Sequence, residues 1–239
     1  MRTLLAIALV FASASAGFAQ TLTAPVHHLA AAPTAPHIKI DAWRGNLSGD
    51  IRVVAWDRAA IQIDVTTDPA DAQYVTVDLN QDGNTITIDA HSTLPRRFFG
   101  LVDAASVRAL VDLHVPRNAL LECKTVNGDV GVRDVTGAIG ATPVNGNIAI
   151  GGSAAVLDVG TVNGKVDAAV APGHWVPQIE IHTVNGDVTL TFPRGFSTHV
   201  SVATVNGDVR DSSPKASGPG SASIKTVNGT IVVQTARNF

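Results

Sequence analysis

The stretch TVNGDV at residues 125–130 decides the fold, because it returns five more times in the second half of the chain. The later copies are PVNGNI at 143–148, TVNGKV at 161–166, TVNGDV at 183–188, TVNGDV at 204–209 and TVNGTI at 226–231. Their asparagines are spaced by 18, 18, 22, 21 and 22 residues. Periods of this length are typical of proteins that stack one supersecondary unit on the next. The repeat therefore predicts a stack of coils that share one corner.

Two all-β architectures place an Asn-Gly corner at regular intervals. Asn-Gly between apolar residues is a strong signal for a two-residue hairpin, so one alternative is a meander of hairpins. In a β-solenoid, equivalent positions lie about 4.8 Å apart along the axis, so that like packs on like. We favour the solenoid, with about six coils, because a meander does not need the same turn at every second connection. An echo of the motif at Val135-Thr136-Gly137 fits coils with two turns and two short strands.

The solenoid gives each position of the repeat a role. The Gly is expected to adopt φ > 0 at the corner, and the Asn amides are expected to form an external ladder. The predicted ladder comprises Asn127, Gly128, Asn145, Gly146, Asn163, Gly164, Asn185, Gly186, Asn206, Gly207, Asn228 and Gly229. The valine before each Asn and the Val or Ile after the corner are expected to fill two interior rows. These rows are Val126, Val144, Val162, Val184, Val205 and Val227, and Val130, Ile148, Val166, Val188, Val209 and Ile231.

The composition also favours stacked strands. Aromatic residues make up 5% of the chain and charged residues 15%, which does not suit a conventional aromatic-rich core. The net charge of −3 gives no electrostatic footprint for nucleic acid or anionic lipid. Cys123 is the single cysteine, so no internal disulfide can form. We expect it to be a small buried hydrophobe.

The first 19 residues have the pattern of a secretory signal peptide. Arg2 supplies the positive charge, residues 4–11 form a short apolar run, and small residues up to position 19 fit cleavage. The apolar run is shorter than the roughly 20 residues that span a bilayer. No later apolar run is long enough either, so we expect the mature chain to be periplasmic or secreted, with no transmembrane segment.

The mature chain divides into three parts. Residues 20–36, rich in Pro and Ala, are expected to form a flexible leader. Residues 37–120 show period-two alternation and are expected to form an N-terminal β region that caps the stack. Within it, NLSGDI at 46–51 is a degenerate copy of the corner, and residues 75–88 are expected to form a hairpin. Residues 121–239 form the β-solenoid repeats.

The second turn of each coil varies and is the candidate binding edge. Insertions at 171–177, 193–197 and 212–222 are expected to project on one side, where solenoids often bind ligands. Trp175, Phe196 and Arg194 are the contact candidates there. The two aromatic side chains would alternatively cover the groove beside the stack.

No catalytic, cofactor or metal site is expected. The position after each corner Gly reads Asp129, Asn147, Lys165, Asp187, Asp208 and Thr230. A lysine in this column argues against a stacked calcium site, and only Asp187 and Asp208 are expected to be direct neighbours. The eight histidines lack metal-ligand spacing. Scattered acids outside this column do not supply the paired carboxylates that glycan cleavage needs.

The signal peptide, LSGDIRVVAWDRAAIQID at 47–64, VDLHVPRNALLECKTVNGDVGV at 111–132 and the recurring TVNGDV together resemble the DUF4097 family of proposed adhesins. The resemblance covers nearly all of the mature chain and implies a β-solenoid similar to autotransporter adhesin heads. It implies an envelope location more firmly than an activity, and it supplies no functional residues.

The sequence thus predicts a non-catalytic, exported envelope β-solenoid that acts as an adhesin or as a structural or binding module. Its partner would be an unidentified envelope glycan or protein, and its oligomeric state is open. Two alternatives remain, a polysaccharide-active β-helix enzyme and a periplasmic accessory in envelope-stress signalling.

Overall fold

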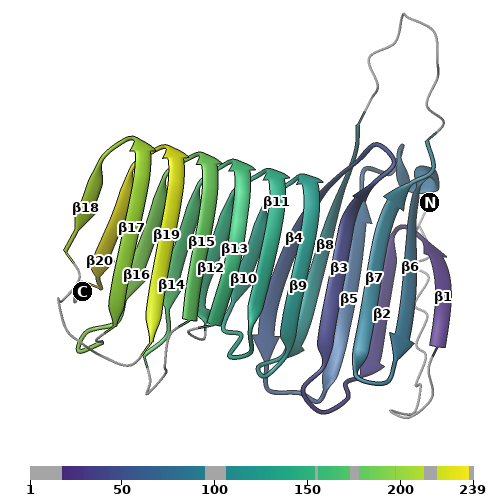
Figure 1. Ribbon diagram of the computed structural model, residues 1–239. Helices are drawn as coiled ribbons and strands as arrows, with labels where there is room; N and C mark the ends of the chain where they lie inside the picture. The colour runs from purple at the N-terminus through teal and green to yellow at the C-terminus, as the bar shows by residue number, and fades with distance from the viewer. Residues whose placement is uncertain are drawn as a thin grey trace, which may run out of the picture.

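The computed structural model describes residues 18–94, 106–153, 156–172, 178–196, 198–212 and 220–236. These residues form an all-β protein with two open, ten-stranded sheets that face each other (Figure 1). One 3-10 turn, Ala72–Tyr74, interrupts the strands. The described part of the chain contains no helix of the length and apolarity needed to cross a bilayer.

Strand order shows how the chain fills the two sheets. The first sheet runs β1 (Phe18–Thr23), β6 (Val75–Asp82), β7 (Thr85–Ser92), β3 (His37–Arg44), β9 (Leu120–Asn127), β11 (Ile139–Asn145), β13 (Val156–Asn163), β15 (Gln178–Asn185), β19 (Ser221–Asn228), β17 (His199–Asn206). The second runs β18 (Val209–Asp211), β20 (Ile231–Thr235), β16 (Val188–Phe192), β14 (Val166–Val170), β12 (Ile148–Ser153), β10 (Val130–Arg133), β4 (Leu47–Trp56), β8 (Val107–Pro116), β5 (Ala60–Thr67), β2 (Val26–Ala31).

Each Val-Asn-Gly corner carries the chain from the first sheet to the second. A strand such as β9, its corner and the following β10 make one two-strand unit, and successive units pair in parallel and in register. Asn127 thus lies opposite Asn145, and Val130 opposite Ile148. The corners line one edge of the molecule, along the top of Figure 1, and the described connection from β10 to β11 lies at the opposite edge. Alternation of side chains buries one face of the inner strands between the sheets.

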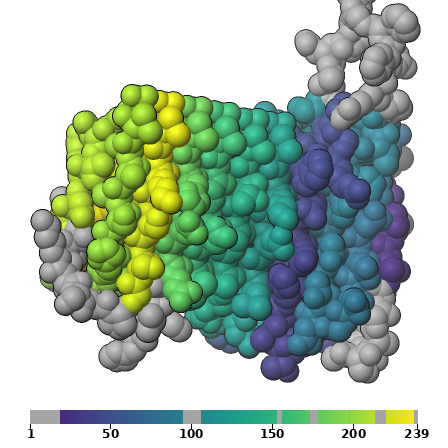
Figure 2. Space-filling model, viewed as in Figure 1, coloured from purple at the N-terminus to yellow at the C-terminus, as the bar shows by residue number. Residues whose placement is uncertain are grey.

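The last two units do not follow sequence order. Strand β19, yellow in Figures 1 and 2, lies between β15 and β17, and β20 lies between β16 and β18. The expectation that Asp187 and Asp208 are neighbours is therefore wrong, because Thr230 lies between them. Burial explains the order. The β20 sequence IVVQT buries Ile231 and Val233 completely, whereas β18 is only VRD and suits the exposed end.

One predicted interior row is wrong as well. The row that begins at Val130 is buried except at Val209, but the valines that precede the corner asparagines point outward. The threonine before four of these valines is buried instead, namely Thr125, Thr161, Thr183 and Thr226. The reason is that β9 continues to Asn127 and its side chains alternate between the two faces of the sheet. Because Cys123 and Thr125 point inward, Val126 points outward.

Residues 20–36 are not a flexible leader throughout. Strand β1 pairs antiparallel with β6, and β2 pairs antiparallel with β5, so this segment closes one end of both sheets. The predicted hairpin is confirmed as β6 and β7. The degenerate corner at 46–51 starts the parallel units, because β3 and β4 pair with β9 and β10 and place Gly49 beside the first repeat.

Candidate binding surface

The corner asparagines form a continuous ladder of side-chain hydrogen bonds along the edge. The Nδ2 of every corner asparagine except Asn127 donates to the Oδ1 of a neighbouring unit, at distances between 2.7 and 2.9 Å. The donor and acceptor pairs are Asn145 to Asn127, Asn163 to Asn145, Asn185 to Asn163, Asn228 to Asn185 and Asn206 to Asn228. The ladder uses the amides within the scaffold, so few of their polar groups remain for a ligand.

The corner glycines are needed mainly for close backbone approach. Among them only Gly207 and Gly229 have a positive φ, of 155° and 152°, so the expectation of φ > 0 at every corner is wrong. A Cβ at Gly186 would lie 1.8 Å from the carbonyl oxygen of Gly164, and one at Gly146 would lie 1.9 Å from that of Gly128. Any side chain here would collide with the next unit, which only glycine avoids.

Buried threonines seal the inner side of the corner. The Thr125 hydroxyl donates to the carbonyl oxygens of Gly49 at 2.9 Å and Ala42 at 3.1 Å. Thr161 likewise donates to Gly146 O at 3.0 Å. This role of the threonines is not among the sequence-based predictions, although the period-two alternation of β9 contains the signal for it.

Three side chains that follow a corner Gly, those of Asp129, Asn147 and Asp187, bond to the backbone of the neighbouring unit. Oδ1 of Asp129 accepts the N–H of Asn147 at 2.7 Å, and Oδ1 of Asn147 accepts the N–H of Lys165 at 2.9 Å. These side chains stabilise the corner rather than project from it. In the described residues, no group of three or more His, Cys, Asp or Glu side chains could hold a metal ion.

The outward valines form an exposed apolar stripe beside the Asn ladder, which we call the valine row. It consists of Val126, Val144, Val162, Val184, Val227 and Val205 in spatial order. Four inner members are between 38% and 41% exposed, and Val205 at the end is 74% exposed. Contiguous apolar surface of this kind marks interaction sites.

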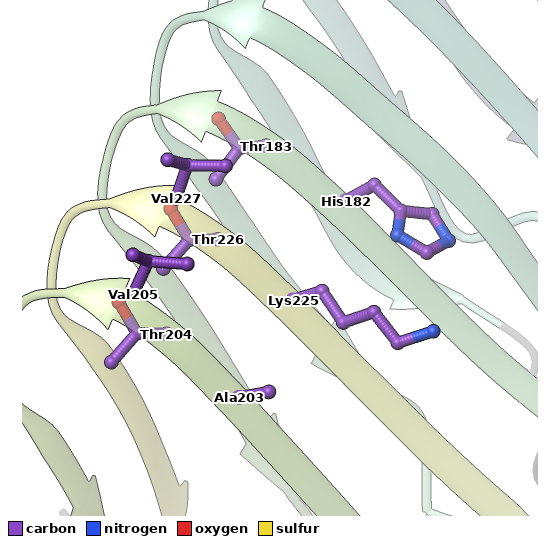
Figure 3. Close-up of a pocket in the computed structure, with 8 residues that line it drawn as sticks. All are labelled: His182, Thr183, Ala203, Thr204, Val205, Lys225, Thr226 and Val227. Atoms are coloured by element: carbon purple, nitrogen blue, oxygen red, sulfur yellow. The ribbon is translucent and has the colours of Figure 1, made fainter.

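A hollow lies at each end of the valine row. At one end, Trp43 occupies the equivalent outward position of β3 and lines a hollow of about 370 Å³ with Val126 and Asn127. At the other end, a hollow of about 360 Å³ lies on β15, β19 and β17 (Figure 3). It is lined by His182, Thr183, Ala203, Thr204, Val205, Lys225, Thr226 and Val227.

Charges flank the apolar stripe on the same face. In register, His182 lies opposite Lys225, which lies opposite Ala203, so the small alanine leaves space beside two basic side chains. His182 Nε2 lies 2.9 Å from Glu180 Oε1. Further along the sheet, Lys124 donates to Glu122 at 2.5 Å, and this bond lowers the pKa of the Glu122 carboxyl.

The sequence-predicted binding edge is only partly described. Trp175 lies outside the described residues. Phe196 is half-buried and stacks on Phe192, with ring centroids 5.3 Å apart. Arg194 is exposed, and its Nε donates to the Ala236 carbonyl at 3.3 Å. The structure thus packs Phe196 onto the scaffold and leaves Arg194 at the surface.

Cys123 lies inside the molecule, as expected. It is completely buried between the sheets, and burial raises the pKa of its thiol to about 12. The thiol is therefore protonated at neutral pH and packs as a small apolar side chain.

Comparison with known proteins supports the fold class. No family model and no curated protein matches the chain. A solved structure from Clostridium sporogenes, described as a "putative cell adhesion protein", matches with a TM-score of 0.52 and 12% identity, over 92% of this chain and 100% of that chain. A "putative adhesin" from Bacteroides fragilis matches with a TM-score of 0.40 and 14% identity, over 95% and 100%. At such identities, the first likeness shows the fold alone.

Proposed function

We propose that this chain is a non-catalytic, exported β-solenoid of the cell envelope that binds an envelope glycan or protein through the valine row. The solenoid is supported by the parallel, in-register pairing of successive two-strand units. Export to the periplasm or beyond is supported by the signal-like first 19 residues. An adhesin-type role is supported by the description of the Clostridium sporogenes structure.

The observation that carries the proposal is the uniformity of the exposed row. All six corners have valine at this outward position, although the fold does not demand it. Two residues earlier, the outward position is occupied by Lys124, Thr142, Gly160, His182, Ala203 and Lys225. The sheet therefore accepts almost any side chain on this face. A repeated exposed valine beside a rigid polar ladder is accounted for by contact with a partner.

Retention by envelope material tests the proposal. The purified protein is incubated with intact cells, with isolated sacculi and with a glycan array, and Val162→Lys and Val184→Lys are compared with the unchanged chain. A charge in the middle of an apolar contact surface is expected to reduce retention by on the order of tenfold or more.

Val156 offers a matched control. It lies on the same strand, β13, as Val162, and both side chains are 41% exposed, but Val156 is outside the valine row. Val156→Lys should leave retention unchanged. Absence of binding to every envelope fraction, or an equal loss in Val156→Lys and Val162→Lys, would contradict the proposal.

A further inference from the structure

The end of the molecule formed by β17 and β18 leaves its interior open. In the inner units, inward side chains such as Ile181, Ile224 and Ile231 are completely buried. In the last unit, Val202 is only half-buried and Val209 is 42% exposed, although both occupy equivalent inward positions. Apolar side chains that the stack is built to enclose therefore face solvent at this end.

Both sheets also end there in strands with an unpaired edge. Among the described strands, β17 pairs only with β19, and β18 pairs only with β20. Natural edge strands are usually protected by lysine, proline or a bulge. The sequence of β17, HVSVATVN, contains none of these protective residues and spans eight positions. This edge is able to accept another strand.

The opposite end of the molecule is closed. Strand β2 covers the end of the second sheet, and its inward side chains Val26, His28 and Ala30 are no more than 6% exposed. Among the described residues, the second sheet therefore differs at its two ends, and β2 offers no exposed inward side chain to match Val209. A head-to-tail filament would need such a match.

We propose that the open end binds the open end of a second copy of this chain, in a two-fold, tail-to-tail dimer. The open end presents two strand edges with an apolar interior between them, and a single added peptide strand would cover only one edge. A second open end has the same two sheets and the same exposed interior, so it covers both. A two-fold axis then closes the assembly at two copies.

The charges at the open end do not oppose this pairing. Strand β17 carries no Lys, Arg, Asp or Glu, and β18 carries Arg210 and Asp211, which have opposite signs, with Asp211 at the inward position in register with Val233. Two copies of a single-sign edge would repel each other, whereas a surface with both signs can pair with itself. The desolvated centre would be Val202 and Val209 from both copies.

Mass and shape in solution test the dimer. Light scattering coupled to size exclusion should give twice the chain mass at high concentration, and small-angle X-ray scattering should give a particle elongated along the stack. Val209→Lys is tolerated in the monomer, because the side chain is already partly exposed, but buries a charge in the dimer. The dimer dissociation constant should rise by on the order of tenfold or more.

Val156→Lys, with 41% exposure on the outer face against 42% for Val209, should leave the dimer intact. Val202→Lys is a second variant at the open end, and circular dichroism checks that each variant is folded. A monomer at every concentration, an assembly larger than a dimer, or a dimer unchanged by both open-end substitutions overturns the proposal. Pairing of the open end only with a strand of another protein does so too.

Discussion

Asn228 donates its Nδ2–H to Oδ1 of Asn185 at 2.7 Å, although 43 residues separate them. The nearer repeat, with Asn206, lies on the far side of Asn228 and donates to it at 2.9 Å. The final repeat has therefore taken the inner place, and the one before it forms the exposed end. Because the corners are nearly identical in sequence, the ladder continues through this exchange without interruption.

The exchanged order predicts which engineered disulfide forms. In a Cys123→Ala background, Asn185→Cys with Asn228→Cys places two thiols on adjacent parallel strands, within the Cα separation that a disulfide requires. Asn185→Cys with Asn206→Cys places them two strands apart, which is too far. Oxidation followed by mass spectrometry should therefore cross-link only the first pair. Cross-linking of only the second pair would contradict the exchanged order.

Steric contact at the corner predicts that Gly186→Ala is strongly destabilising. The new Cβ would lie 1.8 Å from the Gly164 carbonyl oxygen, so the two units must separate at the ladder. We expect a loss of at least about 2 kcal/mol in the free energy of unfolding, measured by urea denaturation. Gly131→Ala is the matched control, because the nearest atom to its new Cβ would be the Ile51 carbonyl oxygen at 4.0 Å. It should change stability by less than about 0.5 kcal/mol.

The parity of β9 predicts opposite results for two adjacent substitutions. Thr125→Val keeps the shape of the side chain but leaves the buried carbonyls of Gly49 and Ala42 without their donor. It should cost about 1–3 kcal/mol of unfolding free energy. Val126→Thr changes an outward side chain and should be nearly neutral. Chemical denaturation would detect the difference, and the reverse pattern would mean that the valine faces the interior.

Burial of Cys123 predicts an unreactive thiol and a loss of stability at high pH. The native thiol should resist a maleimide reagent at pH 8 and react once the chain is unfolded in guanidinium. Burial raises the pKa of this thiol in the folded state from its ordinary value of 9.0 to about 12. The unfolded thiol thus ionises first, so stability is complete below about pH 9 and falls as the pH rises toward 12.

Cys123→Ala should remove this part of the pH dependence, measured by urea denaturation at a series of pH values. For the labelling experiment, Val144→Cys in the Cys123→Ala background is the positive control, because Val144 is exposed. Rapid labelling of native Cys123 would contradict the buried placement.

Local patterns in the sequence were sufficient for several features. The all-β class follows from β-branched alternation, and the β6–β7 hairpin follows from two alternating runs around a Gly-containing turn. The regular recurrence of Asn predicted a side-chain ladder, because stacked Asn amides form hydrogen bonds with one another. These features depend on residues close together in the chain or on direct repetition.

Other features needed long-range information. The apolar character of Val126 predicts an interior position. Side chains alternate between the two faces of a strand, however, so Val126, three residues after the buried Cys123, points outward. The glycine role was assigned to backbone conformation, whereas the carbonyl of the neighbouring unit imposes it. The Ala- and Pro-rich segment up to residue 36 lacks a strong strand signal of its own, and its strands form by pairing with β5 and β6.

The sequence by itself therefore determined that the chain is all-β, that it repeats one corner, and that Asn and Gly occupy that corner. Only the tertiary structure decided the spatial order of the units, which face of each strand is exposed to solvent, and where the stack ends. The physical reason is that identical corners pair equally well in any order. The order then depends on how much apolar side chain each unit buries, and β20 buries Ile231 and Val233 where β18 offers Arg210 and Asp211.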